Sequence, residues 1–119
     1  MSAFNQPLPQ LNVQELATYL SDPDARQTLQ FVDVREPEEL AIAQLEGFTH
    51  LPLSQFGQWS GKIQDYLDPH TETIVMCHHG MRSAQMCYWL MQQGFTNVKN
   101  LVGGIDAYSE VVDSTVPRY

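Results

Sequence analysis

The sequence predicts an α/β domain in which a mostly parallel central sheet carries helices on both faces. Short β-rich runs alternate along the chain with segments whose apolar residues recur at helical spacing, the pattern of this fold class. The chain has 119 residues, of which 43% are hydrophobic, enough to bury the core of one domain without disulfides. We therefore expect a single domain over residues 1–119, with its core at about 10–112 and terminal arms at 1–9 and 113–119.

The first half of the chain is predicted to contain two strands and three helices. A helix opens at Leu11-Asn12, where Asn12 is a good N-cap and Glu15 completes a capping-box pair, and it ends at residues 21–24. The later elements are a buried strand at 30–34, a short helix at 37–43, a short strand at 50–53 and a weak helix from Ser54 to Tyr66 or Leu67.

The second half contains the clearest pattern in the sequence. A buried strand at 73–76 is followed by a short loop and an amphipathic helix at 83–93, which Gly94 caps. A last strand at 98–102 precedes two glycines and a helix at 105–111. Because the crevice of a parallel α/β sheet lies beyond the carboxyl ends of its strands, the loop after residue 76 is the first place to look for chemistry.

Composition and charge exclude several classes of protein. Two cysteines are too few for a secreted disulfide framework, and the N-terminal residues have neither the basic start nor the apolar run of a signal peptide. The sequence has no apolar run of about 18 residues, so we expect no membrane span and a cytoplasmic location. A formal net charge of −8 disfavours partnership with nucleic acid or with an anionic membrane surface.

Cys77 ends the buried strand and stands five residues before Arg82, at the mouth of the next helix. The reactive form of cysteine is the thiolate, and three features of this loop favour that anion. The positive helix end and the peptide N–H groups of residues 78–83 can surround the sulfur, Arg82 adds a fixed cation, and Gly80 allows the loop to close tightly. We therefore predict that Cys77 is a catalytic nucleophile rather than a strand-end core cysteine.

His78 and His79 follow the cysteine directly and suggest a metal site. Neighbouring side chains of one loop seldom share a tetrahedral zinc, and no C-x2-C or H-x3-H spacing accompanies them. We expect neither a metal nor another cofactor, and the two histidines either line the pocket or lie exposed. Cys87 lies among apolar residues of the following helix, where a core cysteine is expected.

The loop at residues 77–83 resembles the active-site loop of single-domain rhodaneses, a family of sulfurtransferases. Three further segments resemble motifs of that family and occur in the family's order, at residues 31–40, 45–52 and 100–108. The four segments together span nearly the whole domain. The resemblance therefore implies a rhodanese-like three-layer fold.

The resemblance also implies a function. Cys77 would attack the outer sulfur of thiosulfate or of a persulfide, become a cysteine persulfide, and pass that sulfur to cyanide, a cellular thiol or an acceptor protein. The backbone N–H groups of the loop would hold the persulfide and Arg82 the anionic donor, while Asp33 and Arg35 would brace the scaffold. The predicted substrate-binding residues are His78, His79, Gly80, Met81, Arg82 and Ser83.

Two other functions remain open. Phosphatases and arsenate reductases share this fold, but their loop places five residues between cysteine and arginine, whereas Cys77 and Arg82 have four between them. The shorter loop suits one sulfur atom better than a phosphate. The second alternative is a module that binds one partner protein or relays persulfide to it, and such a relay would still use Cys77.

Overall fold

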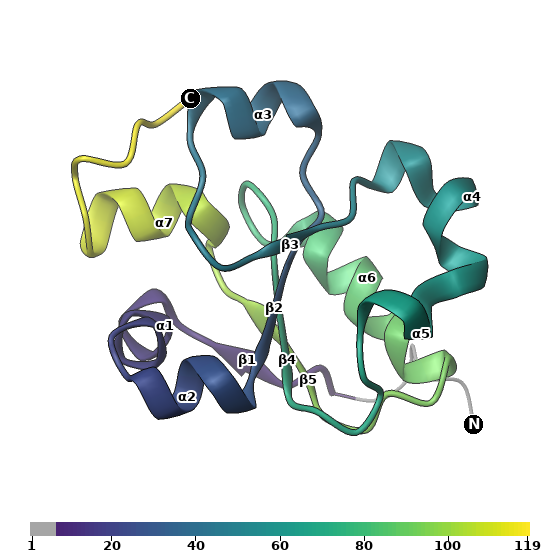
Figure 1. Ribbon diagram of the computed structural model, residues 1–119. Helices are drawn as coiled ribbons and strands as arrows, with labels where there is room; N and C mark the ends of the chain where they lie inside the picture. The colour runs from purple at the N-terminus through teal and green to yellow at the C-terminus, as the bar shows by residue number, and fades with distance from the viewer. Residues whose placement is uncertain (1–6) are drawn as a thin grey trace.

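Five parallel strands form the centre of the computed structural model, which describes residues 7–119 (Figure 1). The strands lie in the order β1-β5-β4-β2-β3. Their bounds are Gln10–Leu11 for β1, Gln30–Asp33 for β2, Thr49–His50 for β3, Thr73–Met76 for β4 and Val98–Leu101 for β5. The prediction of an α/β domain with a mostly parallel sheet is confirmed.

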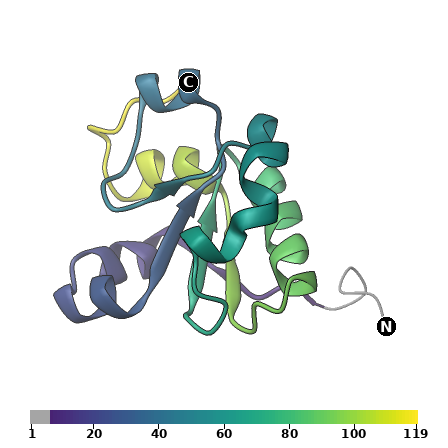
Figure 2. The same ribbon diagram turned by 45° about the vertical axis from the view of Figure 1, so that its right-hand side comes forward.

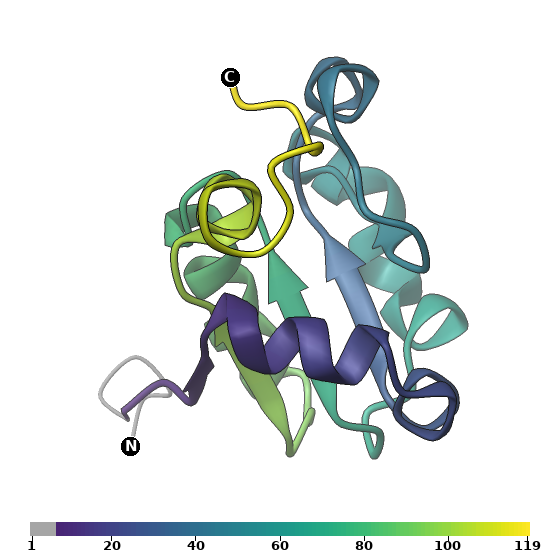
Figure 3. The same cartoon turned by 90° about the vertical axis from the view of Figure 1, so that its left-hand side faces the viewer.

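Helices cover both faces of the sheet, as Figures 1 and 2 show. One face carries α1 (Val13–Leu20), α2 (Pro23–Thr28) and α7 (Gly104–Val111), and α1 runs across the sheet in the side view of Figure 3. The opposite face carries α4 (Phe56–Trp59), α5 (Ile63–Tyr66) and α6 (Met81–Gln92). The short helix α3 (Pro37–Ile42) lies beyond the carboxyl ends of the strands.

The two faces of β4 belong to two separate hydrophobic clusters. Ile74 and Met76 pack with the apolar residues of α1 and α7. Val75 and Cys77 pack on the other side, with α6. The period of two along a strand therefore directs Cys77 toward the α6 face. Asp33 pairs in register with Met76, so the segment after β2 lies beside the cysteine loop.

The start of the domain differs from the prediction by one element. The capping box of α1 is present, because the side chain of Asn12 accepts from the N–H of Glu15 and the side chain of Glu15 accepts from the N–H of Asn12. Leu11, however, belongs to strand β1, whose backbone pairs with β5, and not to the helix. A strand of two residues shows no periodicity, so the sequence does not reveal it.

The other differences concern one strand and several helices. The strand predicted at 50–53 is shorter and lies at Thr49–His50, and Leu53 begins a 3-10 turn. The sequence predicts that residues 21–24 end the first helix and form a turn. In the structure, Asp22 caps the additional helix α2, whose first residue is Pro23. Asp-Pro is a helix-start signal as well as a turn signal, so the same residues allow both structures. The weak helix after Ser54 is broken into α4 and α5 with 3-10 turns, and α6 begins at Met81, two residues earlier than predicted.

Asp33 and Arg35 form a buried ion pair under the cysteine loop. The guanidinium of Arg35 donates to both carboxylate oxygens of Asp33, with Nε–Oδ1 at 3.1 Å and Nη2–Oδ2 at 2.8 Å. Nη2 also donates to the backbone oxygen of Ala43 at 2.8 Å, which ties β2 to the end of α3. These contacts fit the bracing role that the resemblance implies.

The terminal arms lie partly outside the described residues. The arm expected at 1–9 includes residues 1–6, which are not described. The arm expected at 113–119 leaves α7 and returns toward α3 and the cysteine loop (Figure 3). Within residues 7–119, no helix has the length and apolar character needed to cross a bilayer.

Candidate active site

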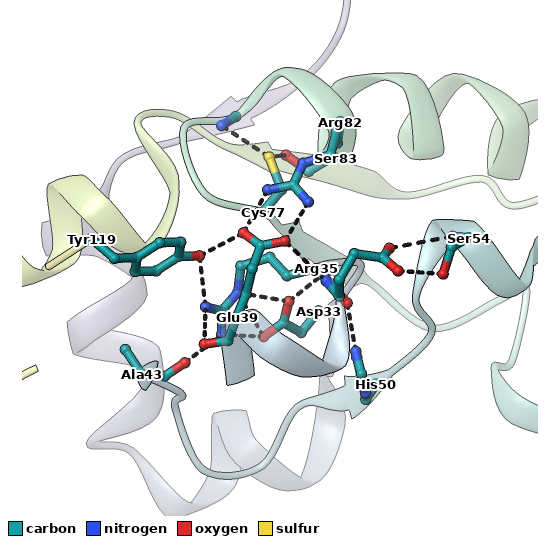
Figure 4. Close-up of polar contacts among 12 residues, drawn as sticks. Asp33, Arg35, Glu39, Ala43, His50, Ser54, Cys77, Arg82, Ser83 and Tyr119 are labelled. Atoms are coloured by element: carbon teal, nitrogen blue, oxygen red, sulfur yellow. Dashed lines mark hydrogen bonds and ion pairs between the residues drawn. The ribbon is translucent and has the colours of Figure 1, made fainter. Parts of the chain in front are cut away.

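Cys77 lies directly after β4, and only 1% of its surface is exposed. Two donors are directed at its sulfur (Figure 4): the N–H of Gly80 at 3.0 Å from Sγ, and the hydroxyl of Ser83 at 3.2 Å. The first comes from the loop and the second from the opening turn of α6. Hydrogen-bond donors at a helix N-terminus stabilise a negative charge, so the position suits a thiolate or a persulfide anion.

The loop closes because Gly80 adopts a left-handed conformation, with φ of +105°, at the N-cap of α6. A side chain there would also crowd the backbone, because a Cβ would stand 3.2 Å from the carbonyl oxygen of Leu101. The carbonyl of Gly80 accepts a hydrogen bond from Nδ2 of Asn100 at 2.9 Å. Gly80 therefore places its own N–H on the sulfur while β5 fixes its carbonyl.

Asn100 is a further residue of the candidate site that the site prediction missed. It is buried on β5, and its side-chain oxygen faces the hydroxyl of Ser83. Asn100 thus connects the two residues that donate to the sulfur, because it binds the carbonyl of Gly80 and the hydroxyl of Ser83. Two signals were available: a polar residue within a predicted strand, and its position at the start of the segment 100–108 that resembles a family motif.

The single proton of the Ser83 hydroxyl has two possible acceptors. It can point to Oδ1 of Asn100 or to Sγ of Cys77. When Cys77 is a thiol, its S–H can donate to Ser83, whose hydroxyl then donates to Asn100. When Cys77 is a thiolate, rotation of the hydroxyl brings the proton to the sulfur. Ser83 is therefore able to follow the charge state of the nucleophile.

The glycine pair at residues 103–104 fixes the other side of the loop. The N–H groups of Ile105 and Asp106, in the first turn of α7, donate to the carbonyls of Cys77 and His78 at 3.0 and 3.1 Å. A Cβ on Gly104 would stand 2.5 Å from the carbonyl carbon of His78, and closer still to the carbonyl oxygens of His78 and Cys77. Only glycine permits α7 to approach the loop this closely.

Arg82 lies over the loop in a bidentate ion pair with Glu39 of α3 (Figure 4). Its Nη1 is 2.6 Å from Oε1 of Glu39, and its Nη2 is 2.9 Å from Oε2. Hydrogen bonding by Arg82 is the largest cause that lowers the pKa of Glu39 to about 2, and Glu39 in turn raises the pKa of Arg82. The cation predicted to hold a donor is therefore already paired with a carboxylate.

Tyr119 lies beside this ion pair, at the end of the arm. Its hydroxyl donates to Oε2 of Glu39 at 2.7 Å and accepts from Nη1 of Arg35 at 2.9 Å. Its ring stacks on the imidazole of His78, with centroids 3.9 Å apart and planes 5° apart. Burial, together with other interactions, raises the pKa of Tyr119 to about 12, so the hydroxyl stays protonated and can donate. The sequence left the order of this segment open.

The two loop histidines occupy different surroundings. His78 is half-buried between the rings of Tyr119 and His79, and burial lowers its pKa, with a further contribution from His79. His79 is largely exposed, and its Nε2 lies 3.7 Å from a carboxylate oxygen of Asp106. The pocket role therefore fits His78 better than His79. Met81 lies on the surface and is 79% exposed.

Potential metal ligands of His78, His79 and Asp106 lie within 4.8 Å of one another. The loop sequence alone does not reveal this group, because Asp106 comes from α7. Both carboxylate oxygens of Asp106 accept hydrogen bonds from Arg118, at 3.0 and 3.2 Å. A metal cation at this place would have to compete with that guanidinium for the carboxylate, which disfavours a metal site here.

Cys87 is fully buried within α6, as predicted. Burial, and secondly the nearby charge of Cys77, raises the pKa of Cys87 to about 12. A thiol with such a pKa stays protonated at neutral pH and is a poor nucleophile. The two cysteines thus separate into one at the loop and one in the core.

The structure is thus a parallel α/β domain with a candidate cysteine nucleophile at the end of a central strand. The cysteine receives an amide and a hydroxyl hydrogen bond at the N-terminus of the next helix. A family model described as "Rhodanese-like domain" matches residues 12–111. The chain therefore belongs to the rhodanese-like domain family. This confirms the resemblance that four sequence motifs indicated.

Individual relatives agree with this family. The chain is 45% identical over 114 residues to "Rhodanese-like/PpiC domain-containing protein 12, chloroplastic" of Arabidopsis thaliana, covering 96% of this chain and 38% of that protein. It is 31% identical over 77 residues to "Thiosulfate sulfurtransferase GlpE" of Actinobacillus succinogenes, covering 65% and 66%. It is 30% identical to "Adenylyltransferase and sulfurtransferase UBA4" of Debaryomyces hansenii, covering 92% of this chain and 25% of that protein. The chain thus spans much less than the full length of the first and the third of these relatives.

Solved structures show the same fold. The chain superposes on a rhodanese-related protein from Thermoplasma volcanium with a TM-score of 0.69 and 27% identity, covering 92% of this chain and 95% of that one. A rhodanese-like domain protein from Staphylococcus aureus gives a TM-score of 0.72 at 23% identity, covering 94% and 99%. The second likeness supports the fold alone.

Proposed function

We propose that this domain is a sulfurtransferase that carries one sulfane sulfur on Cys77. The observation that carries the proposal is the pair of hydrogen bonds from the Gly80 N–H and the Ser83 hydroxyl to Sγ of Cys77. Such a site stabilises a thiolate before transfer and can hold the terminal sulfur of a persulfide after it. Relatives named as sulfurtransferases, GlpE and UBA4, support the same class of activity.

The proposed reaction has two steps. In the first, the Cys77 thiolate attacks the outer sulfur of the donor, a sulfur–sulfur bond forms at Sγ, and the old one breaks. Sulfite leaves if the donor is thiosulfate, and a thiolate leaves if it is an alkyl persulfide, each with the electron pair of the broken bond. In the second step, cyanide or a thiolate attacks the outer sulfur of the Cys77 persulfide and releases thiocyanate or a new persulfide, together with the Cys77 thiolate.

The four-residue spacing between Cys77 and Arg82 disfavours the phosphatase and arsenate reductase alternatives. The structure adds a physical reason. A phosphate or arsenate dianion needs uncompensated donors and positive charge, but Arg82 is held by Glu39. Rapid hydrolysis of p-nitrophenyl phosphate by the purified domain would overturn this choice.

An acceptor protein is the second candidate for the last step. The chain covers only a quarter of UBA4 and about two fifths of the Arabidopsis relative, so domains of this kind also occur within longer proteins. A "Putative sulfur carrier protein YrkF" of Bacillus subtilis is also 30% identical, over 90 residues. These relatives favour persulfide relay to a protein thiol as a variant of the same chemistry.

Two further proposals concern the macromolecular partners of the domain and its cellular location. The net charge of −8 supports the expectation that neither nucleic acid nor an anionic membrane surface is a partner. The cytoplasmic location expected from the sequence is likewise a proposal, and the Arabidopsis relative is named as chloroplastic.

Intact mass spectrometry after treatment with thiosulfate or a persulfide donor tests the proposal. The wild type should gain the mass of one sulfur atom and lose it when cyanide is added, with thiocyanate as the product. Cys77→Ser should gain none, whereas Cys87→Ser, which removes the buried thiol, should behave as the wild type. An unmodified wild type with every donor would show that the domain does not transfer sulfur.

A further inference from the structure

The positive charge at the cysteine loop is compensated by carboxylates on every side that the structure describes. Arg82 pairs with Glu39, Arg118 with Asp106, and Arg35 with Asp33. A donor dianion that approached Cys77 would therefore meet matched pairs, within a protein whose net charge is −8. The loop stabilises negative charge on the sulfur itself, through Gly80 and Ser83, but offers little to a second anionic group on the donor.

Glu39 is fixed in place more firmly than a surface carboxylate. Its Oε1 accepts from Nη1 of Arg82 and from the backbone N–H of Glu36 at 3.0 Å. Its Oε2 accepts from Nη2 of Arg82 and from the hydroxyl of Tyr119. Each oxygen thus receives two hydrogen bonds. Only 18% of the Glu39 side chain is exposed, against 35% for Arg82. Because its position is determined by four donors, Glu39 does not swing away readily when an anion arrives.

We propose that Glu39 is a specificity-determining residue that makes the site select an alkyl persulfide donor over thiosulfate. This inference rests on the proposed sulfur transfer and names the donor class for it. Thiosulfate keeps a doubly charged form at neutral pH, whereas the reacting end of an alkyl persulfide carries at most one negative charge. The exposed side chain of Met81 adds an apolar surface to the same loop, which suits an alkyl group.

The step with this donor balances without another reactant. The Cys77 thiolate attacks the terminal sulfur of R–S–SH, the Sγ–S bond forms, and the sulfur–sulfur bond of the donor breaks. The products are the Cys77 persulfide, which keeps the proton, and the thiolate R–S⁻, which takes the electron pair. One negative charge is present before and after, so the site need not hold the extra charge that sulfite would leave.

Tyr119 has a separate part in this arrangement, as a positioning residue. Its hydroxyl contacts neither Cys77 nor Arg82 but links Glu39 to Arg35, whose own pair with Asp33 is buried. Loss of the hydroxyl should leave Glu39 with fewer donors and let it leave Arg82 more often. The residue therefore acts on donor choice through Glu39.

The test measures second-order rate constants for loading Cys77, from the growth of the persulfide mass in quenched samples. The donors are thiosulfate and the persulfide of 2-mercaptoethanol, and the variants are Glu39→Gln, Glu38→Gln and Tyr119→Phe. Glu38 is the matched control, because it carries the same charge one residue away in α3 but is exposed to solvent. Wild type should load faster with the alkyl persulfide than with thiosulfate.

Glu39→Gln should raise the thiosulfate rate constant by about tenfold and change the rate constant for the neutral persulfide by less than about twofold, because Coulomb energy is proportional to donor charge. Glu38→Gln should change either by less than about twofold, since exposed charges are screened. Tyr119→Phe should shift the ratio of the two rate constants in the same direction as Glu39→Gln, whereas a purely structural loss would lower both equally.

Two results would overturn the inference while leaving sulfur transfer intact. One is a wild type that prefers thiosulfate. The other is a Glu39→Gln variant in which both rate constants change by the same factor or fall together, which would mean that Glu39 only holds Arg82 in place. Absence of any Cys77 persulfide with both donors in the wild type would instead refute the proposed function, and the inference with it.

Discussion

Gly104→Ala should displace the backbone carbonyls of the cysteine loop, without a direct contact to the sulfur of Cys77. Gly104 has a φ of +61°, and its new Cβ would lie 2.5 Å from the carbonyl carbon of His78. The left-handed conformation costs a non-glycine residue about 1 kcal/mol, and overpacking against backbone adds about 1–3 kcal/mol. Weakening of the two hydrogen bonds from Ile105 and Asp106 to the loop carbonyls adds about 1 kcal/mol. The expected loss is therefore about 3–5 kcal/mol, a large part of the stability of a typical domain.

Gly57→Ala is the matched control for this change. Gly57 lies in α4, has no positive φ, and a Cβ there would have no neighbour within 4 Å. Alanine is favoured over glycine within a helix by up to about 1 kcal/mol, so this variant should be as stable as the wild type or more stable. Urea unfolding gives the free energies, and the alkylation rate of Cys77 by iodoacetamide reports the loop. A Gly104→Ala protein within about 0.5 kcal/mol of wild type, with an unchanged alkylation rate, would refute the reasoning.

Three further substitutions test other parts of the site. Asn100→Ala should lower the rate of Cys77 loading by about tenfold, because Gly80 and Ser83 both lose the partner that holds them; loading at the wild-type rate in a folded variant would contradict this. Arg82→Ala should slow loading by thiosulfate more than loading by an alkyl persulfide, since the unpaired Glu39 then repels the dianion more strongly; equal effects on both donors would remove that electrostatic role. Glu39→Gln should remove an acid-sensitive part of the stability: the pKa of Glu39 is lowered from 4.5 to about 2, so its contribution is present above pH 4.5 and is lost as the pH falls toward 2. Urea unfolding at several pH values should show the wild type more stable by about 1–2 kcal/mol at neutral pH, after allowance for the exposure of Arg82, and the difference should vanish near pH 2.

The fold was predictable because its strongest signals are local. Three elements each depend on a few neighbouring residues: the capping box at Asn12 and Glu15, the buried strand before Cys77 and the helix after it. The structure confirms all three. The errors fall where local signals are weak or ambiguous. Strand β1 exists only because its two residues pair with β5, and α2 begins at an Asp-Pro pair that also suits a turn.

The site was predictable only as far as the loop extends along the chain. Asn100 comes from β5, Asp106 from α7, Glu39 from α3 and Tyr119 from the final arm. Glu38 and Glu39 illustrate the difficulty. Both are acids in the first turn of α3, where the sequence shows only that they favour the helix end. One faces solvent and the other receives Arg82. The local sequence distinguishes Glu39 only as the acid three residues after the N-cap Glu36, and it does not reveal the contact with Arg82.

The pairing of Arg82 also changes how the loop must stabilise its sulfur anion. The sequence suggests a cation, a helix end and a ring of backbone N–H groups acting together. In the structure the cation is balanced by Glu39, so its field at Sγ is largely that of a dipole. The stabilisation of a Cys77 anion then rests mainly on neutral donors: the Gly80 N–H, the Ser83 hydroxyl and the first turn of α6. Neutral donors act at short range, on the atom they touch, whereas a free cation attracts every anion that approaches. A site built in this way can hold a charged sulfur on the protein while discriminating among the molecules that deliver it.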